Sequence, residues 1–316
     1  MKLFINLGLP KTSCTNLQTQ VYTQFKNIEY LGKKSFLVEK KYIGSTETDR
    51  QKTLFTKINE FIEFRNESLV NDNYINKLKD EFNFFCKTCE KKILISNESW
   101  LIPYQKDNLT GKTVTVSQWE KLDRLKKLLK NLDIEVKYFI INRDPMEGIP
   151  SLYSTLHHLI TDLFGRKYNT LTSFIKLYKK NKFNELKLFL DVYHVKKIKE
   201  KLLPDKLEIF EYSLLDNYPE EFLKQISNFL DIEVDPLLIK KISTRARVSK
   251  KTGSSYLVDD KFEFYFFLKK IIPKFLIKIL KEKKYIVEFQ KKFKIERKID
   301  VDEEFLSDVL KNENII

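Results

Sequence analysis

Residues 3–15 of the chain read LFINLGLPKTSCT, and this stretch decides which fold we expect. Its first five residues are apolar apart from Asn6, as in a buried strand. A short run of small and polar residues follows. Leu17, Val21 and Phe25 then recur at every fourth position, as on one face of a helix. The predicted order is therefore strand, tight loop, helix.

The loop between this strand and helix has the chemistry of an anion-binding site. Unpaired backbone N–H groups and the positive end of the helix dipole meet at a helix N-terminus, and Lys11 adds a full charge. The hydroxyl groups of Thr12, Ser13 and Thr15 supply further donors. We expect the loop to bind a phosphate or sulfate group. A tight strand–helix turn without a ligand is the alternative.

The composition fits one large α/β domain, alone or with an appendage. The chain has 316 residues, 42% of them hydrophobic, which is enough for a sizeable core. Its 58 Lys and Arg against 44 Asp and Glu give a formal charge of +14. Such a charge attracts nucleotides, acidic glycans, nucleic acid or anionic lipid without choosing among them. Only 7 Gly and 8 Pro argue against a long disordered region.

The cysteines and the absence of a targeting signal indicate where the protein works. We find no signal peptide and no apolar run of membrane-spanning length, so we expect a cytoplasmic protein. Three Cys suggest a reducing compartment without a disulfide framework. Cys86 and Cys89 form a lone CxxC pair without the further ligands that zinc requires, and we interpret them as ordinary thiols.

Four further segments have the pattern of strands, and helical patterns separate them. The strand patterns cover residues 28–32, 92–96, 136–141 and 207–212. The nearly continuous apolar run at 136–141 is typical of a central parallel strand. Helical spacing covers 35–92, 117–132 (with Ser117 as N-cap), 152–203 and 219–230. We predict an α/β domain over residues 1–260, with a helical excursion at 35–92.

Polar residues follow two of these strands at the edge where parallel sheets bind ligands. Glu98 follows the strand at 92–96 and is a candidate general base; a surface or helix N-terminal carboxylate is the alternative. Arg143 follows the strand at 136–141, and its guanidinium fork suits phosphate. Ser151, eight residues further on, can add a hydroxyl.

Two short motifs resemble those of sulfotransferases. Residues 8–15 have the order Gly-x-Pro-Lys-Thr-x-x-Thr, which resembles the family's 5′-phosphosulfate loop. Ser13 and Cys14 depart from that pattern, since they replace the usual Gly and a Thr. Arg-x-Pro beginning at Arg143, followed by Ser-x-Tyr beginning at Ser151, resembles the element in which the family holds the donor's 3′-phosphate.

The resemblance spans roughly residues 2–256 and implies a sulfotransferase fold: a central parallel sheet of about five strands with helices on both faces. It implies 3′-phosphoadenosine 5′-phosphosulfate (PAPS) as the donor and a hydroxyl, here of a glycan or lipid-linked glycan precursor, as the acceptor. It implies that Glu98 is the general base and that Lys11 neutralises the negative charge that builds up on the bridging and leaving oxygens. It requires no metal. The residues expected to bind the donor are Pro10, Lys11, Thr12, Ser13, Cys14, Thr15, Asn16, Arg143, Ser151, Arg247, Lys250 and Gly253.

Other interpretations of these residues stay open. A phosphate-loop kinase or nucleotide hydrolase would need a metal-binding Asp after a strand, and Asp144 has such a position; the lack of Gly before Lys11 argues against this class. A non-catalytic basic protein that binds membrane or nucleic acid would explain the charge but not the two motifs. The basic segment around Arg247 can be a solvated loop. We interpret His157 and His158 as packing or surface residues, and as the next candidates for the base.

Residues 261–316 differ from the rest of the chain and are predicted to form a basic, aromatic-rich helical extension. Residues 261–300 contain 13 Lys and Arg against 5 Asp and Glu, a balance of +8, with several Phe and Tyr interleaved. A basic amphipathic helix can lie on an anionic membrane surface or dock on the sheet with its lysines in water. Peripheral contact with the inner membrane surface and docking on the core both remain open.

Overall fold

The computed structural model of the chain describes most of the segments from which the fold is built. The described residues are 1–10, 12, 17–32, 35–38, 41–44, 49–63, 71–106, 112–165, 170–181, 184–202, 207–233, 235, 238, 256–259, 296–299 and 301–316. Several predicted donor-binding residues lie outside them, namely Lys11, Ser13, Cys14, Thr15, Asn16, Arg247, Lys250 and Gly253. The predicted domain boundary at residue 260 and most of the basic segment 261–300 also lie outside the described residues.

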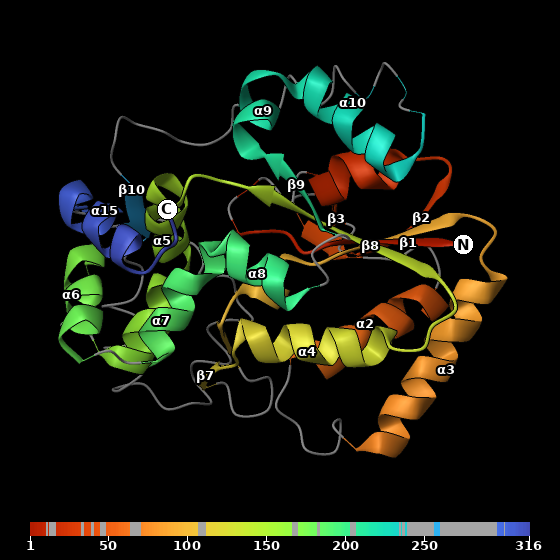
Figure 1. The fold of residues 1–316 in the computed structure, drawn as a ribbon, viewed down its shortest axis with the longest axis horizontal. Helices are drawn as coiled ribbons and strands as arrows, with labels where there is room; N and C mark the ends of the chain where they lie inside the picture. The colour runs from red at the N-terminus through yellow and green to blue at the C-terminus, as the bar shows by residue number, and fades with distance from the viewer. Residues whose placement is uncertain are drawn as a thin grey trace.

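A five-stranded parallel sheet forms the centre of the fold, as predicted (Figure 1). Its strands lie in the order β2-β5-β1-β8-β9, and every neighbouring pair is parallel. The first strand, β1, is central, with β5 on one side and β8 on the other. The order of the strands changes direction between β1 and β8, which is the point where open α/β sheets bind ligands. The strands are β1 (Lys2–Asn6), β2 (Ile28–Gly32), β5 (Lys92–Ser96), β8 (Glu135–Asn142) and β9 (Leu207–Glu211).

Two apolar cores, one on each face, hold the sheet between helices. Side chains alternate along each strand, so Leu3 and Ile5 of β1 enter the larger core while Phe4 enters the smaller one. Figure 1 shows α10 on one side of the sheet and α2 and α4 on the other. The larger core takes residues from α2 (Asp49–Glu63), α3 (Asp72–Thr88), α4 (Gln118–Leu129) and α5 (Pro145–Phe164), and the smaller one from α9 (Tyr212–Asn217) and α10 (Pro219–Leu230).

The segment after the first loop buries the predicted residues but is not a regular α-helix where the structure describes it. Leu17, Val21 and Phe25 all lie in the smaller core. The segment consists of a π-helical turn, η1 (Leu17–Val21), and a 3₁₀ turn, η2 (Tyr22–Gln24). Positions 19, 21 and 23 are β-branched, and such residues lose side-chain freedom in an α-helix. The spacing therefore predicted the buried face correctly and the helix type incorrectly.

The helical prediction for residues 35–92 was wrong for its first part. Residues 35–44 form a hairpin of β3 (Ser35–Val38) and β4 (Lys41–Gly44) before α2 and α3 begin. A strand of four residues repeats the alternation of apolar and polar side chains only twice, which is too little to be recognised in a sequence rich in charged residues. A second short antiparallel pair, β6 (Tyr104–Lys106) and β7 (Thr113–Thr115), follows β5 along the chain.

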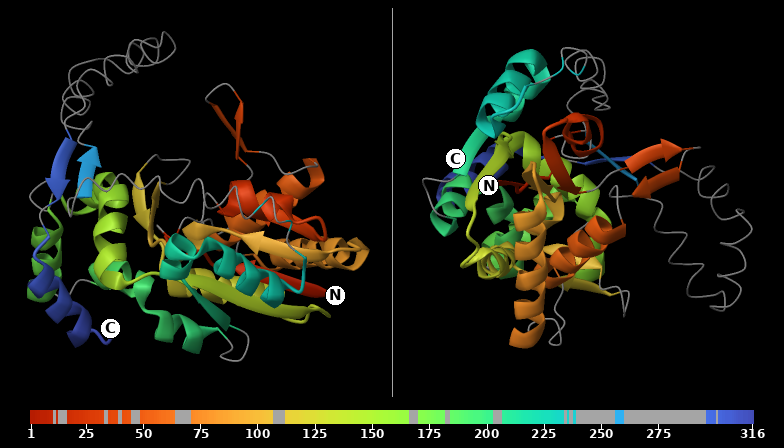
Figure 2. Two further views of the ribbon diagram at one scale, coloured as in Figure 1. Left: turned by 90° about the horizontal axis from the view of Figure 1, so that it is seen from above. Right: turned by 90° about the vertical axis from the view of Figure 1, so that its right-hand side faces the viewer.

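A third antiparallel pair, β10 (Tyr256–Asp259) with β11 (Glu296–Ile299), joins two distant parts of the chain. Asp259 pairs with Glu296, so residues 260–295 connect the two strands of one hairpin. Figure 2 shows this pair beside α5. The residues on either side of the basic segment are therefore held next to each other.

The C-terminal helix packs onto the same core as the sheet. In α15 (Glu303–Asn312), the side chains of Leu306, Val309 and Leu310 are buried in the larger core. This helix contacts α5 and α6. The long helical region predicted for 152–203 begins earlier, at Pro145, and is divided into several shorter helices. These pieces are α5, α6 (Leu171–Asn181), α7 (Asn184–Leu190), η6 (Asp191–Tyr193) and α8 (Val195–Lys201).

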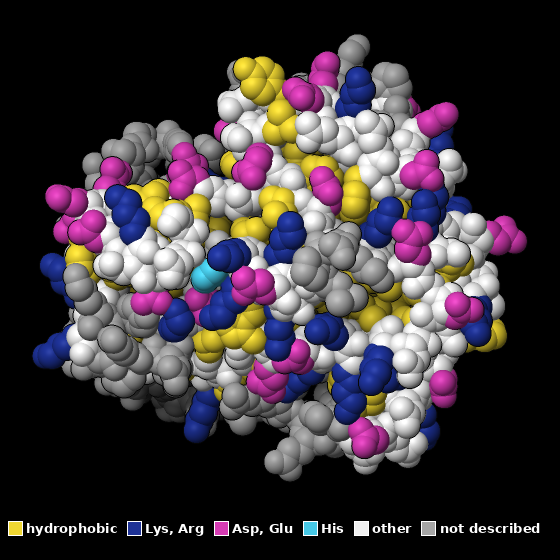
Figure 3. Space-filling view, viewed as in Figure 1, with side chains coloured by type: hydrophobic (Ala, Val, Ile, Leu, Met, Phe, Trp, Pro, Cys, Tyr) yellow, Lys and Arg dark blue, Asp and Glu magenta, His cyan; other side chains and the backbone are white. Residues whose placement is uncertain are grey.

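The described surface carries charges of both signs. In the view of Figure 3, Lys and Arg side chains alternate with Asp and Glu and form no continuous basic patch on that face. Among the helices that the structure describes, none is long and apolar enough to cross a bilayer.

Candidate functional site

Polar residues mark the carboxyl ends of the four strands β5, β1, β8 and β9. Asn6 of β1 is in register with Ser96 of β5, and Asn142 of β8 is in register with Glu211 of β9. The Asn142 amide donates to both carboxylate oxygens of Glu211 at 3.2 Å. Because the strands are parallel, the segments that follow them leave from one edge of the sheet.

The loop after β1 turns on the buried side chain of Asn6. The Oδ1 atom of Asn6 accepts a hydrogen bond from the Gly8 N–H at 2.9 Å, and its Nδ2 donates to the Tyr22 hydroxyl at 2.8 Å. Gly8 has a φ of 36°, a conformation that L side chains rarely adopt. Leu7 N–H also donates to the Phe139 carbonyl of β8 at 3.1 Å. The glycine and the asparagine together set the path of the chain out of the sheet.

The next part of the loop is closed by two hydroxyl groups. Thr12 Oγ1 donates to the Leu9 carbonyl at 2.6 Å, and the Tyr193 hydroxyl donates to the Pro10 carbonyl at 2.8 Å. The Thr12 hydroxyl, which was predicted to donate to an anion, is fully buried and makes this bond within the loop, and its role toward an anion stays a prediction. The Tyr193 contact spans 183 residues of sequence. Sequence patterns give no signal for it.

Glu98 begins a 3₁₀ turn, η4 (Glu98–Leu101), directly after β5. The Asn97 N–H donates to the Asn6 carbonyl at 3.3 Å, so this turn is tied to the end of β1. Asn97 also donates through Nδ2 to Glu63 at 2.9 Å and accepts from the Ser99 N–H at 3.0 Å. Glu98 itself is half-buried. Hydrogen bonds therefore hold the residues on both sides of Glu98.

A buried lysine that the sequence analysis did not single out also holds this turn through hydrogen bonds to its carbonyl groups. Lys121 of α4 has no exposed surface, and its ammonium donates to the carbonyls of Ser99 at 3.0 Å and Ile102 at 2.7 Å. Burial lowers the pKa of Lys121 to about 8, and the Glu63 carboxylate opposes the shift. Lys121 lies four residues before the core residue Leu125, so the helical spacing alone could have predicted that Lys121 is buried.

We expect Lys121→Met to remove a pH-dependent part of the protein's stability. The pKa of Lys121 is about 8 in the folded protein against 10.5 for the ordinary side chain, so the unfolded chain binds more protons between these values. The free energy of unfolding of the wild type should rise across this range by on the order of 3 kcal/mol from this residue. Urea denaturation at both ends of the range measures the rise. An equal rise in wild type and variant would contradict the assignment.

Arg143 is held at the carboxyl end of β8 by two side chains. Its guanidinium lies 3.1 Å from a Glu147 carboxylate oxygen and 5.0 Å from the centre of the Tyr212 ring, and the side chain is only 11% exposed. A fork of donors fixed in this way suits a planar or tetrahedral oxyanion. The neighbouring Asp144, the metal ligand of the kinase alternative, caps α5 by accepting from the Met146 N–H at 2.9 Å.

Ser151 lies within the helix α5. Its residue is 8% exposed. Gly148, one turn earlier, faces the Tyr193 ring so closely that a Cβ there would lie 2.4 Å from Cε1 of the ring. Residues three apart are neighbours on one helix face. The face of α5 that carries Ser151 therefore adjoins the tyrosine that holds Pro10.

The structure also describes His157 and the cysteine pair. His157 is buried, with its ring edge-to-face against Tyr153 at 5.6 Å. Cys86 and Cys89 are free thiols, and burial raises the pKa of Cys86 to about 12, so it stays protonated near neutral pH. In the part of the chain that the structure describes, no cluster of three or more His, Cys, Asp or Glu could hold a metal ion.

Comparisons with known proteins give fold-level likenesses only. No protein-family model matches the chain, and no curated protein matches it in sequence. It is similar to the crystal structure of a sulfotransferase from Alicyclobacillus acidocaldarius, with 11% identity, 76% of this chain and 89% of that chain covered, and a TM-score of 0.40. A sulfotransferase domain from the curacin biosynthetic pathway has 13% identity, 75% coverage of each chain and a TM-score of 0.35. A sulfotransferase domain from the Synechococcus PCC 7002 olefin synthase has 14% identity, 75% and 76% coverage, and a TM-score of 0.35. The function of this chain is therefore inferred from its own residues.

Proposed function

We propose that the chain is a sulfotransferase that moves a sulfuryl group from PAPS to a hydroxyl of a glycan or glycan precursor. One observation carries the proposal: the loop that begins at Gly8 and the segment that begins at Arg143 leave the adjacent strands β1 and β8 at the switch point of the sheet. These are the two segments whose motifs resemble the phosphosulfate and 3′-phosphate elements of sulfotransferases, in the same order along the chain.

The residues present at this edge fit a nucleotide with two anionic groups. Residues 10–16, with Lys11, would hold the 5′-phosphosulfate, and Arg143 with Ser151 would hold the 3′-phosphate. Arg143 fits this role because Glu147 and Tyr212 already orient its guanidinium, which has five N–H donors to share. We propose Arg247, Lys250 and Gly253 as a further contact to the 3′-phosphate, on the sequence resemblance alone.

The chemistry of the proposed reaction requires a base and a cation at opposite ends of one line. When bound, PAPS supplies the activated sulfuryl group. Glu98 would accept the proton of the acceptor hydroxyl as its oxygen forms a bond to sulfur. Lys11 would stabilise the negative charge left on the phosphate oxygen when its bond to sulfur breaks. Arg143 and Ser151 would orient the donor rather than take part in the chemistry.

A label-transfer experiment tests the proposal directly. The full chain is incubated with PAPS labelled in its sulfuryl group and with candidate acceptors that include soluble and lipid-linked glycans, with and without magnesium. Transfer of label without a magnesium requirement supports the proposal. Magnesium-dependent hydrolysis of ATP with no transfer from PAPS would instead favour the phosphate-loop kinase or hydrolase.

Arg143→Ala is expected to weaken binding of adenosine 3′,5′-bisphosphate by about 10- to 150-fold, because a charge-assisted hydrogen bond contributes about 1.5–3 kcal/mol. Binding of adenosine 5′-monophosphate should change little, since it lacks the 3′-phosphate. Calorimetry with both nucleotides measures the difference.

Arg124→Ala is the matched control for this variant. Arg124 is also 11% exposed and also pairs with a Glu four residues away, Glu120, but it lies on α4. It should leave both nucleotide affinities unchanged. A wild-type protein that binds the two nucleotides equally would overturn the assignment of the 3′-phosphate site.

The acceptor and its location form the second part of the proposal. We propose a glycan precursor met at the inner surface of the membrane, with residues 261–300 in peripheral contact with anionic lipid. The support is the charge balance of +8 and the interleaved Phe and Tyr of that segment. The lipid-linked acceptors of the label-transfer experiment test this part separately from the donor.

A further inference from the structure

We propose that Tyr193 is a positioning residue that fixes the anion-binding loop from outside it, an inference that rests on the proposed function of that loop. The Tyr193 hydroxyl donates to the Pro10 carbonyl at 2.8 Å, and both groups are buried. Pro10 shares a peptide unit with Lys11. Since a peptide unit is planar, a bond that holds its carbonyl oxygen also constrains the direction of its N–H. The tyrosine therefore acts on the peptide unit that leads from Pro10 into the proposed anion-binding segment.

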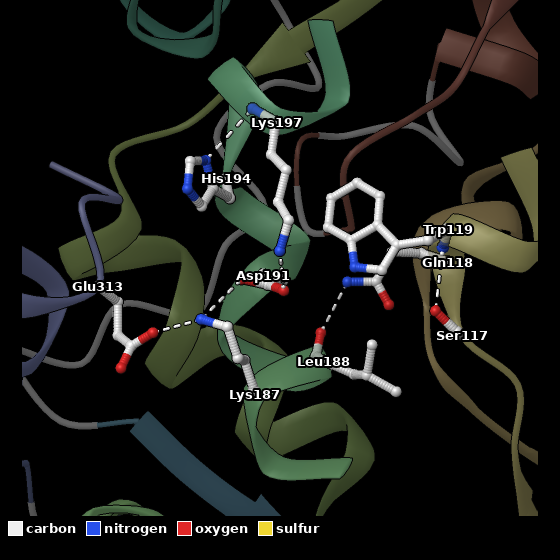
Figure 4. Close-up of polar contacts among 9 residues, drawn as sticks. All are labelled: Ser117, Gln118, Trp119, Lys187, Leu188, Asp191, His194, Lys197 and Glu313. Atoms are coloured by element: carbon white, nitrogen blue, oxygen red, sulfur yellow. Dashed lines mark hydrogen bonds and ion pairs between the residues drawn. The ribbon is translucent and has the colours of Figure 1, made fainter. Parts of the chain in front are cut away.

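The turn that carries Tyr193 is itself fixed by ion pairs to a buried carboxylate (Figure 4). Asp191, two residues earlier in η6, is 1% exposed, and its carboxylate lies 2.9 Å from the Lys197 ammonium and 3.6 Å from that of Lys187. Lys187 also pairs with Glu313, which directly follows α15. Side chains from α7, α8 and the C-terminal segment thus converge on this one turn. Such a cluster keeps the phenol in place for its bond to Pro10.

The hydroxyl end of the Tyr193 ring also lies against α5. Gly148 has no side chain where the ring passes, and a Cβ at that position would lie 2.4 Å from Cε1 and 2.5 Å from Cζ of the ring. Tyr193 therefore joins the two halves of the proposed donor site, one through a hydrogen bond and the other through packing.

Removal of the hydroxyl alone separates positioning from packing. Tyr193→Phe keeps the buried ring and loses only the bond to Pro10. Tyr138→Phe is the control, because Tyr138 is also a buried tyrosine of the larger core, 5% exposed, and its hydroxyl makes no hydrogen bond to the described residues of the loop. If the Tyr193 hydroxyl had only a general structural role, its loss would lower global stability and would not change the loop after β1 more than the loss of the Tyr138 hydroxyl does.

The first measurement is amide hydrogen exchange of residues 7–16 without ligand, in the full chain. We expect faster exchange of this peptide in Tyr193→Phe and no change in Tyr138→Phe. Gly148→Ala, which displaces the ring, should produce the same local effect and should add nothing in the Tyr193→Phe background. Equal loop exchange in Tyr193→Phe and Tyr138→Phe would overturn the proposal.

The second measurement is binding of adenosine 3′,5′-bisphosphate. We expect its affinity to fall about 3- to 10-fold in Tyr193→Phe and to stay unchanged in Tyr138→Phe, as the loss of one hydrogen bond would produce. The two failures are distinguishable. A wild-type protein that does not bind the nucleotide contradicts the proposed function, whereas faster loop exchange with unchanged affinity contradicts the positioning role of Tyr193.

Discussion

Glu98→Gln should lower turnover by about 10²–10⁴-fold and leave donor affinity unchanged. The amide is nearly isosteric with the carboxylate but cannot accept the proton of an acceptor hydroxyl. The fold should be kept, because the hydrogen bonds that hold this turn come from Asn97, Ser99 and Lys121. The measurement is initial rate at saturating donor, together with the affinity for adenosine 3′,5′-bisphosphate.

A control variant completes this test. Glu135→Gln, at the opposite edge of the sheet on β8, should leave the rate unchanged. If Glu98→Gln keeps more than about a tenth of the wild-type rate, the base lies elsewhere, and His157 and His158 become the next residues to change.

Lys11→Ala should lower turnover by about 10²–10³-fold, more than it weakens donor binding. Negative charge on the leaving phosphate grows in the transition state, so a cation placed there stabilises that state more than the ground state. Turnover at saturating donor and nucleotide affinity from calorimetry separate the two effects. Lys26→Ala is the control, because Lys26 is exposed just after η2. Unchanged turnover in the Lys11 variant at saturating donor would exclude the role.

The parallel sheet could be predicted from the sequence because each of its strands is a short apolar run. The predicted strand at 136–141 and the observed β8 differ by one residue at each end. Helices with a strong apolar period were also found, and Ser117 caps α4 as predicted by accepting from the Trp119 N–H. These features depend on neighbours in sequence, which patterns record directly.

The parts of the site that could not be predicted depend on contacts between distant residues. The bond from Tyr193 to Pro10 and the bonds from Lys121 to the turn after β5 arise only when the helices pack on the sheet. A lysine among many others gives no sign of burial except its spacing. The motifs thus predict which residues would meet a ligand, and the structure adds residues that hold the described parts of those segments in place.

The β10–β11 pair has a consequence for how this chain can change. Its strands hold the two ends of residues 260–295 next to each other through the pairing of Asp259 with Glu296. Antiparallel strands can be joined by a turn of only two residues, such as Asn-Gly. The strand pairing by itself therefore allows a connection of another length or composition between β10 and β11.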